Sequence, residues 1–121
     1  MNVINRLICF KFYKSSNFEI KTVSVPSSNI PNYVKGYLQY TTYGKWVLLR
    51  ASDLTFSNQS ENGIAENIIS DIVPAPLQGS AGCAWSTIGY YSSEVHISET
   101  KLYIRTVSNR PVWGTLCYLA K

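Results

Sequence analysis

Residues 35–56 read KGYLQYTTYGKWVLLRASDLTF, and this stretch has the clearest strand pattern of the chain. It contains two runs rich in Tyr, Trp, Val, Leu and Thr, the residue types that suit a pleated and half-buried surface. The runs are separated at Tyr43-Gly44-Lys45, where the glycine permits a tight reversal of the chain. Because alternate residues of a strand face opposite sides, the pattern predicts a β-hairpin with arms at 37–43 and 46–56.

The rest of the chain continues as short strand-like runs separated by turn residues. Segment 66–72 has helical spacing of isoleucine, yet its density of β-branched residues favours an extended segment. We expect a loop at 26–32, a polar connection at 57–66, and further strand-like runs at 7–14, 18–25, 81–91, 94–106 and 111–120.

These features predict an all-β fold without long helices. No stretch shows helical periodicity over three or more turns, and no repeat of 20–50 residues is present. Residues 7–14 and 18–25 are expected to form an opening hairpin around Ser15-Ser16-Asn17. The fold class that we predict is an antiparallel β-sandwich, jelly-roll or fibre-head-like, with about eight strands.

Length and charge limit the possible functions. With 121 residues the chain is expected to form a single domain, residues 1–121, around one core. Only 15% of the residues are charged, where about a quarter is usual, which suits a sugar-facing surface or a protomer in an oligomer. The net charge of +4 is spread without a dense basic cluster, so nucleic-acid binding is not expected.

Three cysteines, Cys9, Cys83 and Cys117, have no metal-ligand spacing, and each lies in an apolar run. We expect free thiols, and a Cys83–Cys117 pair only if their strands are neighbours. Between Arg6 and Lys11 there are four apolar residues, whereas a signal peptide needs about 7–15 and a membrane span about 20. Neither export through this N-terminus nor membrane insertion is therefore expected.

The order of motifs carries a family resemblance. Gly36-Tyr37-x-x-Tyr40 and Gly44-Lys45-x-Val47 are followed by Pro74-Ala75-Pro76 and by three strand-like runs that end near Tyr118. Residues 35–118 thereby resemble the C-terminal β-sandwich head domains of phage tail fibres, receptor-binding proteins and minor tail structural proteins. Residues 1–34 would supply N-terminal strands and a loop.

The resemblance implies a function as well as a fold. It implies a non-catalytic, receptor-binding or adhesin-type protein of a phage or prophage tail, made in the host cytoplasm and located in the virion. The expected ligand is a saccharide of the host cell surface, and the expected oligomer is a trimer.

Aromatic side chains of the C-terminal half are the candidate binding residues. Trp and Tyr rings stack on the C–H faces of sugars, while neighbouring polar groups bind the hydroxyls. Neighbouring tyrosines on a strand face opposite sides, so at least one of the adjacent pair is exposed or lies at an interface. An alternative is that both tryptophans fill the core. The candidate saccharide-binding residues are Tyr90, Tyr91, Trp85, Trp113, Arg105 and Arg110.

Catalytic and metal chemistry is not expected. The single histidine, His96, lies between Glu94 and Ser98 on an expected strand, and no Cys-His or Ser-His signature surrounds it. Carboxylates such as Asp53 could form a glycosidase pair, but an outward position on a strand explains this residue. We therefore expect no catalytic residue, no metal ligand and no cofactor.

Two other classes of function remain open. A virion decoration protein would use a protein-only interface, with its aromatic residues buried between chains. A bacterial carbohydrate-binding module or a small glycan-cleaving enzyme would instead present aromatics in a groove or two carboxylates in a cleft.

Overall fold

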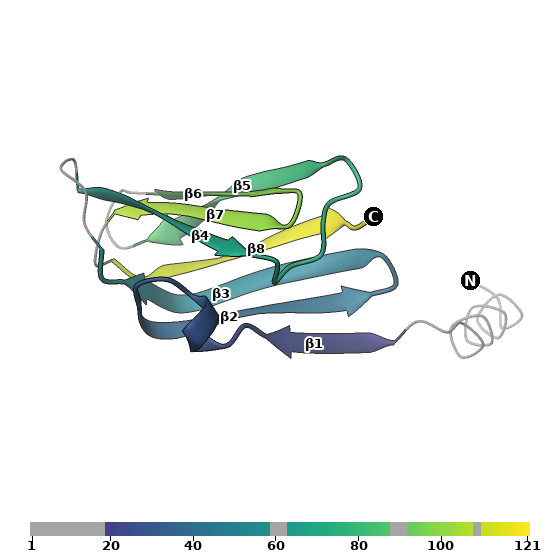
Figure 1. Cartoon of the computed structure of the whole chain (residues 1–121), viewed down its shortest axis with the longest axis horizontal. Coiled ribbons are helices and arrows are strands. Elements are labelled where there is room, and N and C mark those ends of the chain that lie inside the picture. Colours follow the sequence, from purple (N-terminus) through teal and green to yellow (C-terminus); the bar gives the residue numbers. More distant parts are fainter. Residues whose placement is uncertain (1–18, 59–62, 88–91, 108–109) are drawn as a thin grey trace, which may run out of the picture.

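The computed structural model describes residues 19–58, 63–87, 92–107 and 110–121. They form eight antiparallel strands and one short 3-10 helix, so the predicted all-β class and strand number are confirmed (Figure 1). Within these ranges no helix is long and apolar enough to cross a membrane. The elements are β1 Ile20–Ser24, η1 Ser27–Asn29, β2 Tyr33–Tyr43, β3 Trp46–Phe56, β4 Ile64–Ser70, β5 Ser80–Thr87, β6 Ser92–Ser98, β7 Lys101–Val107 and β8 Val112–Leu119.

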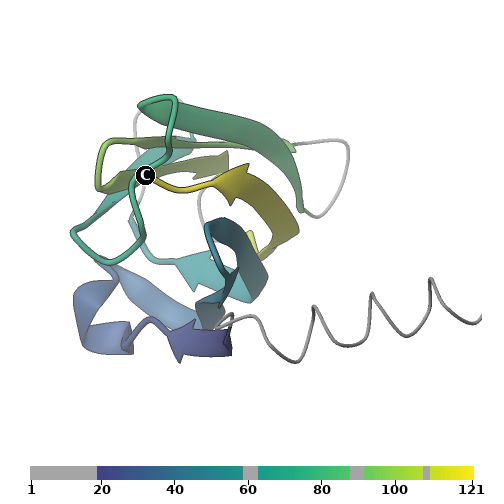
Figure 2. The same ribbon diagram turned by 90° about the vertical axis from the view of Figure 1, so that its right-hand side faces the viewer.

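The strands form one curled sheet in the order β1-β2-β3-β8-β5-β6-β7-β4. The end view in Figure 2 shows the curl, which brings the half β1-β2-β3-β8 opposite the half β5-β6-β7-β4. Only two residue pairs, Ser86–Trp113 and Thr87–Val112, connect β5 to β8 at the corner. Where the sequence predicted the two sheets of a sandwich, the described residues thus form two halves of a single sheet.

The predicted central hairpin is confirmed. Tyr43 pairs with Trp46 around Gly44, whose φ of 57° is the left-handed conformation that glycine adopts without strain. From Trp46 to Ala51, exposed and buried residues alternate, as expected for a strand that covers a core with one side. The alternation ends at Asp53, which has a φ of 53°, and the next three residues of β3 are all buried.

Other predicted boundaries need correction. Segment 66–72 is extended as predicted only as far as Ser70, because the chain bends at Asp71, which has a φ of 60°. Strand β4 begins earlier than expected, at Ile64, inside the expected polar connection. The run 94–106 is two strands, β6 and β7, because the chain reverses at Glu99 with a φ of 54°. Strand β1 pairs with β2, and the strand expected at 7–14 lies outside the described residues.

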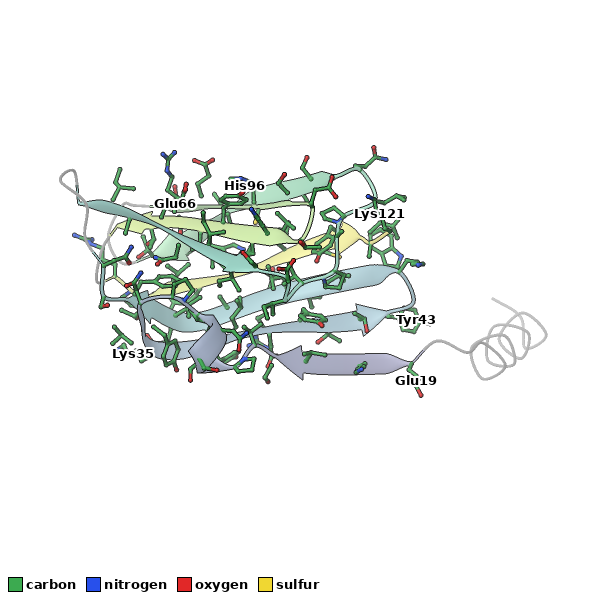
Figure 3. The ribbon with its side chains drawn as sticks, in the orientation of Figure 1. Glu19, Lys35, Tyr43, Glu66, His96 and Lys121 are labelled. Atoms are coloured by element: carbon green, nitrogen blue, oxygen red, sulfur yellow. The ribbon has the colours of Figure 1, made fainter. Side chains whose placement is uncertain are left out.

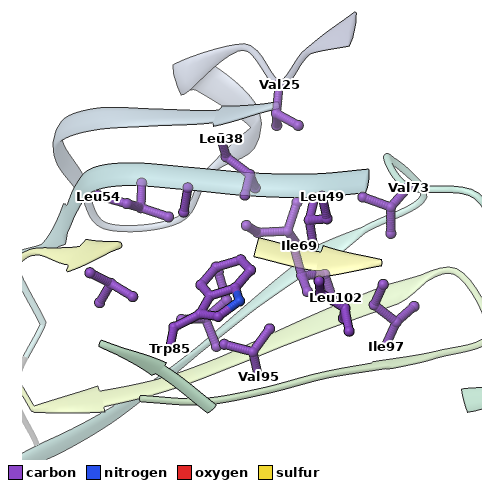
Figure 4. Close-up of a cluster of buried hydrophobic side chains, with 14 of the residues drawn as sticks. Val25, Leu38, Leu49, Leu54, Ile69, Val73, Trp85, Val95, Ile97 and Leu102 are labelled. Carbon is purple, nitrogen blue, oxygen red and sulfur yellow. The ribbon is translucent and has the colours of Figure 1, made fainter. Parts of the chain in front are cut away.

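The core lies between the two halves of the curled sheet (Figure 4). Leu38, Leu49 and Leu54 approach it from β2 and β3, while Val95 and Ile97 approach it from β6. Apolar side chains in such a position contribute about 1.5–3 kcal/mol each by leaving water. The halves are therefore held by side-chain packing in addition to the short β5–β8 pairing.

Trp85 fills the corner where the two halves meet. Its side chain is only 2% exposed, and its indole N–H donates to the carbonyl oxygen of Thr115 at 3.0 Å. A Cβ atom on Gly114 would lie 2.3 Å from the indole ring, so only glycine leaves space for the ring there. The large side chain thus links β5 to β8 beyond their two paired residues.

Candidate functional site

The side of β1, β2, β3 and β8 that faces away from the core forms a continuous surface, which we call the outer face. Its orientation follows from the alternation of these strands, because Leu38, Leu49 and Leu116 point inward and their neighbours point outward. Thr22 and Thr41 confirm the register across β1 and β2, since their hydroxyl oxygens lie 2.9 Å apart on this face.

One end of the outer face combines two exposed aromatic rings with polar side chains. Tyr37 and Trp113 are 41% and 38% exposed. Tyr37 pairs with Ser52 on β3, and Trp113 lies opposite the irregular part of β3, because Gly114 pairs with Ala51 and Val112 pairs with Leu54. These residues define the aromatic-polar end, together with the outward neighbours Gln39, Arg50 and Thr115.

Arg50 brings a positive charge to the aromatic-polar end. Its guanidinium carbon lies 6.0 Å from the centre of the Tyr37 ring, within the range of a cation–π contact. Arg50 pairs with Gln39 on β2 and with Thr115 on β8, so three polar side chains form a row beside the two rings. Such a contact orients the guanidinium and leaves N–H donors for a ligand.

The chemistry of this end suits a polyhydroxylated ligand. Tyr37 and Trp113 lie on strands two positions apart in the sheet, about 10 Å, and therefore offer separate stacking surfaces. Between them, the Ser52 hydroxyl both donates and accepts hydrogen bonds, and the Gln39 amide does the same. The end thus combines two stacking surfaces with hydrogen-bonding groups.

The structure places the six predicted binding residues in different surroundings. Trp113 lies at the aromatic-polar end, and Arg110 is half-buried just before β8 at the same end of the sheet. Tyr90 and Tyr91 lie outside the described residues, in the connection that joins Thr87 of β5 to Ser92 of β6.

Trp85 and Arg105 do not join this site. Trp85 is a core residue, in agreement with the alternative stated for both tryptophans, so its ring cannot meet a ligand. Arg105 lies on β7, three strands away from β8 in the sheet. All six predicted residues come from the C-terminal half of the chain, but the fold distributes this half over the core and two outer surfaces.

Arg105 belongs to a charged surface on the other half of the sheet. Its guanidinium lies 3.7 Å from a carboxylate oxygen of Glu66 and 3.8 Å from one of Glu94. Beside this group the rings of His96 and Tyr103 stack with centroids 4.5 Å apart (Figure 3 labels Glu66 and His96). Because all three charged side chains are well exposed, we interpret them as a solvated network of small energetic value.

The surroundings of Asp53 and of the two described cysteines suggest structural roles. Asp53 lies 3.5 Å from the Lys35 ammonium group and adopts the left-handed conformation that forms the irregularity in β3. Cys83 and Cys117 are free thiols: Cys83 of β5 faces the core, and Cys117 of β8 faces solvent. Burial raises the pKa of the Cys83 thiol, against a lowering by the contact with Trp85, so this thiol is less nucleophilic than an exposed one.

Sequence reasoning missed Tyr37, Arg50 and Ser52 as candidate binding residues. All three belong to the central hairpin of β2 and β3, and their outward position follows from its alternation. The signal was therefore available, because a polar residue at the centre of an apolar strand marks the exposed side. The pairing of β3 with β8, which adds Trp113, is a long-range contact that no local pattern contains.

Comparisons with known proteins give no information about the function. No family model, no curated protein and no solved structure matches the chain. The resemblance to phage tail head domains consequently stays a prediction.

Proposed function

We propose that this protein is a non-catalytic saccharide-binding protein that uses the aromatic-polar end of its outer face. The observation that carries the proposal is the exposure of Tyr37 and Trp113 on one surface with Arg50, Ser52 and Gln39 beside them. Exposed aromatic rings next to hydrogen-bonding groups are the combination that sugars require.

The biological setting that we propose comes from the resemblance. The protein would belong to a phage or prophage tail and bind a saccharide of the host cell surface. A site built on a flat sheet buries little of a small sugar, so a single site would bind weakly. Several copies in an oligomer would increase the avidity without additional contacts.

A glycan array that includes bacterial cell-wall polysaccharides tests the proposal. The wild-type protein is expected to bind at least one class of glycan, and Tyr37→Ala or Trp113→Ala is expected to reduce the signal at least about tenfold. Tyr103→Ala is the matched control, because it removes an aromatic ring from the outer side of β7 and should leave binding unchanged.

Two results would count against the proposed site. One is the absence of binding to any glycan by folded protein. The other is equal loss of binding in the Tyr103→Ala control, because this would move the site to the other half of the sheet.

The decoration protein with a protein-only interface remains a second candidate function. The observation that favours it is a group of large apolar side chains at the opposite end of the outer face, including Trp46 at 55% exposure. This function would be supported if the protein binds no sugar but co-sediments with assembled phage tails.

A further inference from the structure

Large apolar side chains cross the outer face in a row at the end opposite to the aromatic-polar end. Ile20 pairs with Tyr43, Tyr43 with Trp46, and Trp46 with Leu119, so the row crosses β1, β2, β3 and β8. Leu77 continues it, because its N–H donates to the Leu119 carbonyl oxygen at 2.8 Å. We call these five residues the apolar row. Figure 3 labels Tyr43 and Lys121 at this end of the sheet and Lys35 at the other.

Four of the five residues of the apolar row are well exposed. Ile20, Trp46, Leu77 and Leu119 are between 38% and 65% exposed, and Tyr43 is half-buried. Four strand spacings of about 4.8 Å give the row a width of about 19 Å. A second line behind it, formed by Thr22, Thr41, Leu48 and Cys117, adds the exposed Leu48 side chain without adding a charge.

We propose that the apolar row packs against the apolar row of a second copy of this chain around a two-fold axis. The exposed parts of its large side chains and of Leu48 amount to roughly 500 Å², at the upper end of what single proteins leave uncovered. The flanking threonines and Cys117 bring the surface toward the roughly 800 Å² per partner of a stable interface. This inference is independent of the proposed saccharide site.

The absence of charge on the apolar row permits contact with a second copy. A two-fold contact places the same residues opposite each other. Like charges would therefore repel across the interface if the patch carried charges of one sign, whereas an uncharged patch has no such repulsion. The apolar row contains no ionisable acid or base other than Tyr43. The nearby Lys45 ammonium group donates to the carbonyl oxygen of Lys121 at 2.8 Å, and Lys121 lies 3.6 Å from Glu99.

The aromatic-polar end remains accessible in this arrangement. Arg50, a charged residue of the outer face, lies over Tyr37 and away from the apolar row. Face-to-face contact at one end of each sheet would leave the Tyr37 and Trp113 rings of both copies free. The dimer would then present two saccharide sites.

Light scattering coupled to gel filtration tests the interface with the full chain. One chain has a mass of 13.6 kDa, and the wild-type protein is expected at twice that mass at micromolar concentration. Leu48→Glu is expected to weaken dimerisation more than about 100-fold, because the carboxylate appears on both sides of the contact. Ile68→Glu is the matched control: Leu48 and Ile68 are both 42% exposed, but Ile68 lies on β4, and this variant should remain dimeric.

Alkylation of Cys117 gives a second readout that needs no variant. Cys117 is exposed in the isolated chain and lies opposite Leu48 in the pairing of β3 with β8. Dimerisation should therefore slow its alkylation as protein concentration rises. A wild-type protein that is monomeric at all concentrations overturns the inference. This holds even if Cys117 is protected from alkylation, because another segment, such as residues 1–18, would then have to cover the row. A trimer, or an oligomer that Leu48→Glu leaves intact, overturns it as well.

Discussion

At the scale of single residues, the corner between the two halves depends on a pair that the sequence does not reveal. Trp85 and Gly114 are far apart in the chain, and the lack of a side chain at Gly114 makes room for the indole ring. A tryptophan in a small β protein predicts either a core residue or a binding surface, and only the pairing of β5 with β8 decides between them.

Gly114→Ala is therefore expected to lower the free energy of unfolding by about 1–3 kcal/mol, since the added methyl group overlaps the Trp85 ring. Gly82→Ala is the comparison variant, because its Cβ would lie 3.0 Å from the Val95 carbonyl oxygen, a milder contact that should cost less. Urea unfolding measures both. A Gly114→Ala variant as stable as wild type would contradict the packing at the corner.

Tyr118 predicts a dependence of stability on alkaline pH. Burial, with a smaller effect of Tyr40, raises the pKa of Tyr118, and its hydroxyl donates to the Pro74 carbonyl oxygen at 2.7 Å. Because the folded state keeps this proton while the unfolded chain releases it near pH 10, stability is complete below pH 10 and falls above it by about 1.4 kcal/mol per pH unit.

Tyr118→Phe isolates this effect. The variant should be about 1 kcal/mol less stable than wild type near pH 8, because it loses the hydrogen bond to Pro74. The difference should vanish near pH 11, as measured by urea unfolding at both pH values. A difference that stays constant over this range would show that Tyr118 titrates normally in the folded state.

At the scale of elements, local patterns predict the strands, and irregular backbone conformations limit the prediction. The arms of the central hairpin follow directly from the alternation around Gly44. The reversal at Glu99 was missed because Glu-Thr is not a typical turn sequence, yet Glu99 adopts a positive φ there. The early start of β4 was missed because Ile64 and Ala65 directly follow a polar stretch that ends in the turn signal Asn62-Gly63.

Gly36 controls the far end of the hairpin. It has a φ of 92°, and a Cβ atom there would lie 2.2 Å from the Asp53 carbonyl oxygen. Gly36→Ala should therefore cost at least about 2 kcal/mol of unfolding free energy and displace Tyr37, with loss of glycan binding. Gly44→Asn, at a turn where asparagine tolerates a positive φ, should change stability by less than about 1 kcal/mol. Equal effects of the two variants in thermal unfolding would refute this difference.

At the scale of the whole molecule, long-range pairing decides which residues share a surface. Sequence reasoning placed Trp113 and Arg110 together, and both lie toward the same end of the sheet. It also included Arg105, which the order of the strands places on the other half with Glu66 and Glu94. The separation of the outer face into an aromatic-polar end and an apolar row requires the pairing of β3 with β8.

Amide NMR spectra recorded during titration with soluble fragments of bacterial cell-wall polysaccharide would test the saccharide site at the aromatic-polar end. Saturable shifts are predicted for the amides of Tyr37, Arg50, Ser52 and Trp113, including the indole N–H of Trp113. The amides around His96 and Tyr103 should stay unchanged. Shifts confined to β6 and β7, or none with any fragment, would contradict a saccharide site at the aromatic-polar end.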